Sequence, residues 1–281
     1  MTAIAELRPS PIAGTWYSNH PNQLRQQVDG YLDGAEIPDL AGEVVAVIAP
    51  HAGYRYSGRT AGHAFSCLAG LQPEVVAVVS PMHAPSHAPL LTSAHVGYSS
   101  PLGPIWVGRD EIEALDENLK KASLQLSKVA NDEEHSLEIE LPFLQCVLAG
   151  DFKLLPVMMQ TRSEEIVRCL GEALADTLHD RNAVMVASSD LSHFYSEANA
   201  RTLDDLMLQR IGAFDPQGVL RADRDNEGYA CGAAPVAAVL WAARKMGADR
   251  VVVLHYSTSG DQTGDRSSVV GYGAAVVLRT S

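Results

Sequence analysis

Residues 44–58 read Val-Val-Ala-Val-Ile-Ala-Pro-His-Ala-Gly-Tyr-Arg-Tyr-Ser-Gly, and this stretch decides the fold. The run from Val44 to Ala49 has the continuous apolar, β-branched composition of a strand that is buried on both faces. Pro50 and Gly53 mark the end of that strand. His51 lies directly after it. Because open α/β sheets bind ligands outside the carboxyl ends of their strands, His51 is the first candidate metal ligand.

Two further apolar runs also end in histidine-containing loops. They are the run 75–80, followed by Pro-Met-His-Ala-Pro-Ser-His at 81–87, and the run 183–187, followed by Ser-Ser-Asp-Leu-Ser-His at 188–193. Parallel strands bring such ends to one edge of a sheet, and neutral imidazole suits zinc, copper or iron. His51 and His83 are therefore predicted to bind a metal ion together. The alternative is that both side chains only cap buried loops through hydrogen bonds.

Strands and helical patterns alternate along the chain. Further strands are expected at 153–158, 251–256 and 269–278, and helices at 22–32, 57–69, 110–121, 141–148, 161–174, 197–211 and 233–246. Thr161 and Glu164 form the capping-box pattern at the start of one of these helices. The alternation predicts one α/β domain over residues 1–281, with a mostly parallel central sheet flanked by helices.

Charge and hydropathy exclude several functional classes. The 281 residues carry a net charge of −13, and an acidic surface repels phosphate backbones, so nucleic acid is not expected as a partner. No apolar run approaches the roughly 20 residues that span a bilayer. No secretory signal is visible at the N-terminus, so a cytoplasmic protein without a membrane partner is expected. The four cysteines are far apart in the sequence and are expected to be free thiols.

Cys231 has surroundings that differ from those of the other cysteines. Small residues flank it, and it precedes the helix expected at 233–246. A thiolate at a helix N-terminus has a lowered pKa and is a better metal ligand. From spacing alone, a buried cysteine among small residues is the better interpretation.

Two polar clusters are candidates for acid/base chemistry. Asp190 and His193 share one loop, and a carboxylate beside a histidine fixes its tautomer and raises its pKa. Either residue is also a possible metal ligand, and the alternative is an Asx turn that caps the next helix. Glu134, His135 and Glu138 precede an apolar segment. That pattern is typical of residues that orient metal ligands, and equally of a solvated helix start.

Several motifs together resemble the Memo family, also called AmmeMemoRadiSam system protein B. In family order along nearly the whole chain they are Arg8-Pro-Ser-Pro-Ile-Ala-Gly-Thr-Trp-Tyr, Pro50-His-Ala-Gly-Tyr, Glu134-His-Ser-Leu-Glu, Leu141-Pro-Phe-Leu, Ser188-Ser-Asp-Leu-Ser-His, Cys231-Gly and Ser257-Thr-Ser-Gly-Asp. The resemblance implies a fold similar to that of the LigB-type class III extradiol dioxygenases, which are non-haem iron enzymes.

The resemblance also implies a ligand set. The family's metal pocket uses two histidines and a cysteine, which match His51, His83 and Cys231, and a nearby aspartate and histidine match Asp190 and His193. Family members are described as binding iron or copper with a redox role. An animal relative is described as a signalling adaptor that binds phosphotyrosine peptides.

This chain departs from the family pattern at the second strand end. Met82 stands where the family usually has serine or asparagine, and an apparent short insertion separates His83 from His87. The conserved Pro-x-His spacing of the family favours His83, and His87 is the alternative ligand. Cys231 replaces the carboxylate of the dioxygenase facial triad, which argues against ring cleavage.

We therefore expect a metalloprotein with redox chemistry on iron or copper, with zinc as an alternative ion. His193 would act as an acid/base or a further ligand, oriented or charged by Asp190. Tyr54, Glu134 and His135 would line the pocket. One alternative is a non-catalytic module that binds a peptide or small-molecule ligand in the same cleft. Another is a zinc-dependent hydrolase that activates a metal-bound water.

Overall fold

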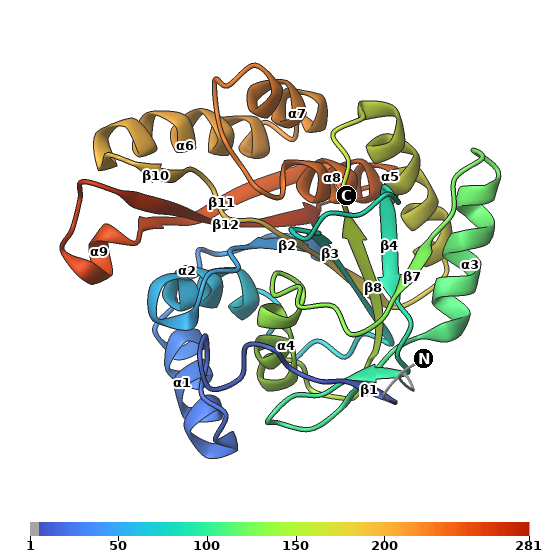
Figure 1. The fold of residues 1–281 in the computed structure, drawn as a ribbon. Coiled ribbons are helices and arrows are strands. Elements are labelled where there is room, and N and C mark those ends of the chain that lie inside the picture. The colour runs from blue at the N-terminus through green and yellow to red at the C-terminus, as the bar shows by residue number, and fades with distance from the viewer. Residues whose placement is uncertain (1–5, 281) are drawn as a thin grey trace.

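A mixed β-sheet forms the centre of the protein. The computed structural model describes residues 6–280, and within them nine strands form one sheet (Figure 1). These strands are β2 (Glu43–Ala49), β3 (Val75–Pro81), β4 (Leu90–Ser93), β7 (Ser127–Val129), β8 (Lys153–Met159), β9 (Ala183–Ser188), β10 (His193–Tyr195), β11 (Arg250–Thr258) and β12 (Val269–Arg279). Their order is β10-β12-β2-β9-β3-β8-β4-β7, and β11 also pairs with β12.

The inner strands account for the valine-rich sequence runs. β2, β9, β3 and β8 are parallel neighbours, and every residue of β3 is buried. Such strands have no solvated face, so continuous apolar runs encode them. The outer strands β12 and β4 pair antiparallel with this core. The predicted α/β class is confirmed, and the antiparallel outer strands make the sheet as a whole mixed.

Helices cover both faces of the sheet. They are α1 (Pro21–Asp33), α2 (Tyr54–Ser66), α3 (Arg109–Lys120), α4 (Leu141–Val147), α5 (Glu164–Leu178), α6 (Glu197–Gly212), α7 (Pro216–Arg224), α8 (Ala233–Lys245) and α9 (Gly260–Thr263). Figure 1 shows α5 to α8 on one side of the sheet and α1, α2 and α4 on the other. None of the helices within residues 6–280 is long and apolar enough to cross a membrane.

Some element starts differ from those expected. The helix expected from residue 57 begins at Tyr54, and the unexpected helix α7 begins where Asp215 accepts a hydrogen bond from the Gly218 backbone. The cap of α5 is Ser163, whose side chain accepts from the Ile166 backbone. The predicted capping by Thr161 is wrong. Its hydroxyl accepts from the Ser163 backbone instead, because the chain makes a turn before the helix begins.

The remaining elements join the N-terminal segment to the middle of the chain. They are β1 (Leu7–Arg8), β5 (Gly97–Tyr98) and β6 (Ile105–Trp106), which form a small second sheet, and the short 3₁₀ helix η1 (Glu138–Glu140).

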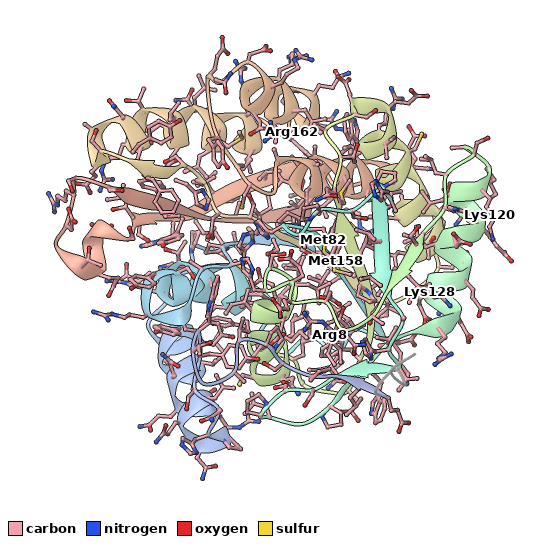
Figure 2. All side chains as sticks on the ribbon, in the orientation of Figure 1. Arg8, Met82, Lys120, Lys128, Met158 and Arg162 are labelled. Carbon is pink, nitrogen blue, oxygen red and sulfur yellow. The ribbon has the colours of Figure 1, made fainter. Side chains whose placement is uncertain are left out.

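A buried arginine fixes the segment that carries Glu134. The guanidinium of Arg8 lies 2.7 Å from Asp132 Oδ1 and 2.6 Å from Glu138 Oε2, and it donates to the Glu134 carbonyl at 2.5 Å (Figure 2). Arg8 is only 1% exposed. A buried charge is stable only when it is paired and hydrogen-bonded, so this cluster holds residues 132–138 firmly against β1.

Candidate metal centre

Two histidines and a cysteine converge at one edge of the sheet. His51 follows β2, His83 follows β3, and Cys231 precedes α8. Their ligand atoms all lie within 4.8 Å of one another, and Cys231 Sγ is 3.1 Å from His51 Nε2. The His51 and His83 rings are 5.4 Å apart between centroids. Of the two histidines that follow β3, the group contains His83, and His87 lies outside it.

A glycine allows the start of α8 to approach β9. A Cβ atom built at Gly232 would lie 2.3 Å from the Ser188 carbonyl oxygen and 2.6 Å from Ser189 Cβ. The Cys231 backbone N–H also donates to the Asp190 carbonyl, at 3.2 Å. Only glycine permits this close packing, which brings Cys231 beside the carboxyl end of β9.

The Cys231 thiol does not have the lowered pKa expected for a cysteine at a helix N-terminus. Burial raises the pKa of this thiol well above its ordinary value, and the nearby Asp190 carboxyl raises it further. Desolvation is the largest of the effects on this thiol in the metal-free protein. Metal coordination deprotonates such a thiol, since the cation supplies the missing charge partner.

Glu134 holds His83 from behind. Its Oε1 accepts from His83 Nδ1 at 2.9 Å, and its Oε2 accepts from the His83 backbone N–H at 2.5 Å. The backbone N–H groups of His135 and Ser136 also donate to Oε1. Burial alone would raise the pKa of Glu134, but these hydrogen bonds hold it well below its ordinary value.

Glu134 is consequently an orienting carboxylate and not part of the pocket wall. His83, Glu134 and His135 do form a second group with metal-ligand spacing. However, both oxygens of Glu134 already accept hydrogen bonds. A carboxylate bonded to the Nδ1–H of a metal-binding histidine fixes the tautomer that leaves Nε2 for the ion. Glu134 therefore supports the group formed by His51, His83 and Cys231.

Asp190 and His193 are anchored separately. Asp190 Oδ1 accepts from the His51 backbone N–H at 2.7 Å, and burial raises the pKa of this carboxyl to about 7. His193 Nδ1 lies 2.8 Å from the Leu191 carbonyl and donates to it. The expectation that Asp190 orients His193 is therefore corrected, because the backbone of the same loop supplies the partner. Burial lowers the pKa of His193, so the ring is neutral at pH 7 with Nε2 unprotonated.

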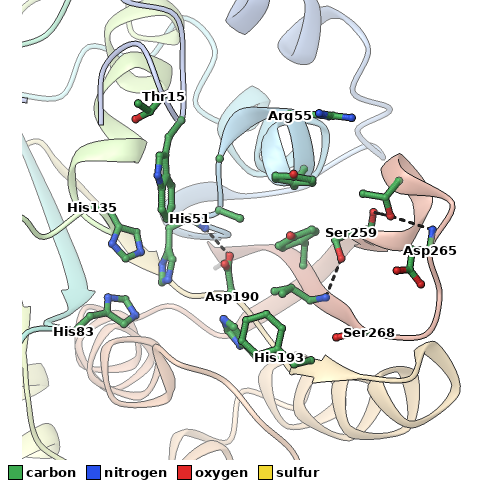
Figure 3. A pocket seen from close by; sticks show the side chains of 18 residues that line it. Thr15, His51, Arg55, His83, His135, Asp190, His193, Ser259, Asp265 and Ser268 are labelled. Atoms are coloured by element: carbon green, nitrogen blue, oxygen red, sulfur yellow. Dashed lines mark hydrogen bonds between the residues drawn. The ribbon is translucent and has the colours of Figure 1, made fainter. Parts of the chain in front are cut away.

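Two of the three ligand residues, His51 and His83, line a cavity of about 780 Å³ (Figure 3), whereas Cys231 lines a neighbouring cavity that His83 also borders. The candidate residues that line the first cavity are His51, His83, His135, Asp190 and His193. Several other side chains complete the wall and were not singled out by the sequence, namely Trp16, Arg55, Tyr56, Phe194 and Tyr272. Trp16 lies in the N-terminal motif that resembles the Memo family, and Arg55 and Tyr56 closely follow His51 in residues 44–58. Their positions in these motifs were the sequence feature that could have indicated a place in the cavity wall.

Tyr54, expected in the pocket wall, is buried in the core instead. It is 2% exposed, its hydroxyl donates to the Ile139 carbonyl at 2.8 Å, and its ring contacts Tyr17 and Phe143. Tyr54 is the first residue of α2, so its side chain turns towards the packed face of the helix.

His135 meets the cavity beside Trp16. The two rings are 4.4 Å apart between centroids, and the His135 and His83 rings stack at 4.7 Å. Burial lowers the pKa of His135 to about 4. The imidazole of His135 is therefore unprotonated at neutral pH and has a nitrogen that can accept a hydrogen bond or bind a metal ion.

Comparison with known proteins places this chain in a family. Residues 8–276 match the sequence profile of the Memo family, described as Memo-like protein. A MEMO1 family protein of Nitrosopumilus maritimus is 31% identical over 273 residues, which cover 95% of this chain and 98% of that protein. A MEMO1 family protein of Methanopyrus kandleri is 35% identical over 282 residues, covering 97% of this chain and 99% of that protein.

A solved structure of an uncharacterized protein from Escherichia coli K12 is 13% identical, with a TM-score of 0.48, and covers 83% of this chain and 100% of that one. The profile match over nearly the whole length and the full-length relatives settle the family: this chain belongs to the Memo family.

Proposed function

We propose that this protein is a redox enzyme that binds an iron or copper ion through His51, His83 and Cys231. The observation that carries the proposal is the convergence of two imidazoles and a thiol within 4.8 Å, with both imidazoles in the wall of a cavity. Two nitrogen donors and a sulfur donor fit soft or borderline ions, which include copper, iron and zinc. When bound, such an ion would supply redox and Lewis-acid chemistry to a ligand in the cavity.

The orientation of both imidazoles supports this use. His83 Nδ1 is engaged by Glu134, and His51 Nδ1 lies 2.9 Å from Ser188 Oγ. Each ring therefore keeps Nε2 for an ion, and His51 Nε2 already faces Cys231 Sγ. Metal-binding histidines commonly have their second nitrogen held in this way, because it fixes the tautomer and the ring plane.

Two neutral histidines would handle protons. His193 and His135 both line the cavity, and burial lowers the pKa of each, to about 4 for His135. At pH 7 both rings are therefore unprotonated, and each would offer a nitrogen that accepts a hydrogen bond from a hydroxyl group of a ligand in the cavity. Asp190 anchors the His51 backbone and keeps that ligand in place.

The cavity would take a small molecule or a short extended peptide. Its volume of about 780 Å³ is within the range of about 300–1,000 Å³ typical of small-molecule sites. The net charge of −13 opposes nucleic acid. A cytoplasmic location remains part of the proposal.

Metal analysis of protein purified without added metal tests the proposal. Iron or copper is expected in the wild type and is expected to be absent from the double variant His51→Ala, Cys231→Ser. The matched control is His87→Ala, Cys67→Ser, which removes the same residue types outside the ligand group and should keep the metal. Equal metal content in the wild type and the first double variant would overturn the proposal.

The identity of the bound metal distinguishes the proposed redox enzyme from the main alternative, a zinc-dependent hydrolase. The neutral His193 would also serve a zinc-dependent hydrolase, as a base for a metal-bound water. Zinc as the sole bound metal, with hydrolysis that proceeds without oxygen, would favour that function. Ligand binding that survives chelation, with no turnover, would favour a binding module.

A further inference from the structure

Ser188 links the candidate ligand His51 to a buried glutamic acid. Its Oγ lies 2.9 Å from His51 Nδ1, 2.6 Å from Glu140 Oε1 and 2.7 Å from the Ser136 carbonyl oxygen. Ser188 is 0% exposed, Glu140 1% and His51 2%. Neither Ser188 nor Glu140 lines the cavity, so this chain of contacts leads away from any bound ligand and into the core.

The three short contacts around Ser188 Oγ leave only one arrangement of hydrogens in which each contact is a hydrogen bond. A serine hydroxyl donates one hydrogen bond and accepts two. The Ser136 carbonyl can only accept, so it must receive the Ser188 hydrogen. The contacts of Ser188 Oγ to Glu140 and His51 are then hydrogen bonds only if Glu140 and His51 each supply the hydrogen. Glu140 must donate as a carboxylic acid, and His51 must donate from Nδ1.

The surroundings of Glu140 agree with this count. Burial raises the pKa of Glu140 well above its ordinary value, and the Asp190 carboxyl raises it further. Glu140 Oε2 has no hydrogen-bond partner among the described residues. An ionised carboxylate with an unpaired oxygen in the core would be far more costly than a neutral acid. In its contact with Ser188, Glu140 is therefore the proton donor.

We infer that Glu140 and Ser188 are positioning residues, which fix the hydrogen of His51 on Nδ1 and turn the unprotonated Nε2 towards Cys231. The contact of 3.1 Å between His51 Nε2 and Cys231 Sγ fits this tautomer, because a thiol donates to an unprotonated nitrogen. The purpose of the arrangement rests on the proposed metal site, but the tautomer itself exists in the metal-free protein.

The two histidines are thus oriented by different means. His83 is held by the ionised Glu134, whereas His51 is held by a neutral acid through a serine. A carboxylate charge on Glu140 would lie near the carboxyl group of the buried Asp190. A neutral donor chain gives the same tautomer without that repulsion.

Long-range ¹⁵N–¹H correlation spectra of the metal-free, ¹⁵N-labelled protein test the inference directly. The His51 signals are identified by their loss in His51→Asn. Hydrogen on Nδ1 is expected in the wild type, and hydrogen on Nε2 would overturn the inference. Because this measurement uses no metal, failure of the proposed enzyme function leaves it intact, and failure of the inference leaves the metal analysis intact.

Variants then test the link to metal binding, with Co²⁺ as the probe. Glu140→Gln keeps an N–H donor towards Ser188 and should retain both the tautomer and the Co²⁺ affinity. Ser188→Ala removes the acceptor for Nδ1, so a mixture of tautomers and a dissociation constant raised about 10- to 100-fold are expected. Ser80→Ala is the control, since Ser80 is a fully buried serine near the end of the neighbouring strand β3, and within residues 6–280 its hydroxyl donates only to the Pro81 carbonyl.

A merely structural role for Ser188 would lower thermal stability in Ser188→Ala and Ser80→Ala alike and leave the tautomer of His51 unchanged. That outcome would overturn the inference. If Ser188→Ala does not fold, the tautomer of the wild type and that of Glu140→Gln decide the question, because hydrogen on Nε2 in either protein contradicts the count of hydrogen bonds.

Discussion

Cys231 Sγ lies 3.1 Å from His51 Nε2, although 180 residues separate the two in the sequence. The contact arises because β2 and β9 are adjacent parallel strands and α8 packs against both. The start of α8 therefore lies at the edge of the sheet where β2 and β9 end. A sulfur donor at this place is the feature that distinguishes the site from an all-nitrogen or carboxylate-containing one.

The first prediction concerns direct coordination by this sulfur. Protein loaded with Co²⁺ should show a thiolate-to-cobalt charge-transfer band in the near ultraviolet, because coordination deprotonates the thiol. The band should disappear in Cys231→Ser and persist in Cys67→Ser, which alters a cysteine outside the ligand group. A band of unchanged intensity in Cys231→Ser would show that Cys231 is not a ligand.

Substitution of Gly232 should weaken metal binding without touching a ligand atom. In Gly232→Ala the new Cβ would lie 2.3 Å from the Ser188 carbonyl, so the start of α8 must move away and take Cys231 with it. Co²⁺ affinity should fall by at least the about 10-fold seen when support for a ligand is lost. Gly150→Ala, with nothing within 4 Å of the new atom, is the control. Equal affinities in the two variants would contradict the prediction.

Neutralisation of Glu134 should also weaken the site. Glu134→Gln replaces the carboxylate that accepts from His83 Nδ1 and from the His83 backbone, so the ring loses its fixed orientation. Isothermal titration with Zn²⁺ should give an affinity lower by about 10- to 100-fold. Glu133→Gln alters the exposed neighbouring residue and should leave the affinity unchanged. An unaltered affinity in Glu134→Gln would exclude an orienting role.

These residues show which parts of the site the sequence predicts. His51 and His83 could be found because each ends a continuous apolar run, and parallel strands share one edge. Cys231 could not be found in this way, since its approach depends on the absence of a side chain at Gly232. Only the family resemblance pointed to it.

The packing of side chains was less predictable than the order of elements. Tyr54 and Tyr56 look alike in the opening stretch, yet the start of α2 at Tyr54 sends the first into the core and the second into the cavity wall. Glu140 reads as one more carboxylate in an acidic segment. Its neutral state follows from burial and from the contacts of Ser188, which depend on residues far apart in the sequence.

A second pair of histidines should make stability depend on pH. The rings of His63 and His255 stack at 4.1 Å between centroids, and burial, His63 and Arg59 lower the pKa of His255 to about 4 from its ordinary 6.5. Between those two values the unfolded chain binds a proton that the folded protein does not. The contribution of His255 is therefore fully present above pH 6.5 and is lost as the pH falls towards 4.

The variant His255→Asn removes this proton-binding difference. Its melting temperature should fall less steeply than that of the wild type between pH 6.5 and pH 4, as measured by differential scanning calorimetry. His179→Asn, at an exposed position, should follow the wild type. Parallel curves for the wild type and His255→Asn would show that this ring does not govern the pH dependence.

The last prediction concerns Phe194, at the mouth of the cavity. Its φ is +65°, it interrupts the pairing of β10 with β12, and its side chain is 76% exposed. The left-handed region costs a non-glycine residue about 1–2 kcal/mol, and such strain persists where function requires it.

Phe194→Gly relieves this strain, whereas Phe194→Ala removes the same ring but keeps the strain. Urea unfolding should therefore find Phe194→Gly more stable than Phe194→Ala by up to about 1 kcal/mol, after the greater flexibility of unfolded glycine is subtracted. Because the ring is mostly exposed, Phe194→Ala should lie close to the wild type. Equal stability of the two variants would mean that the loop relaxes and that the position of Phe194 stores no strain.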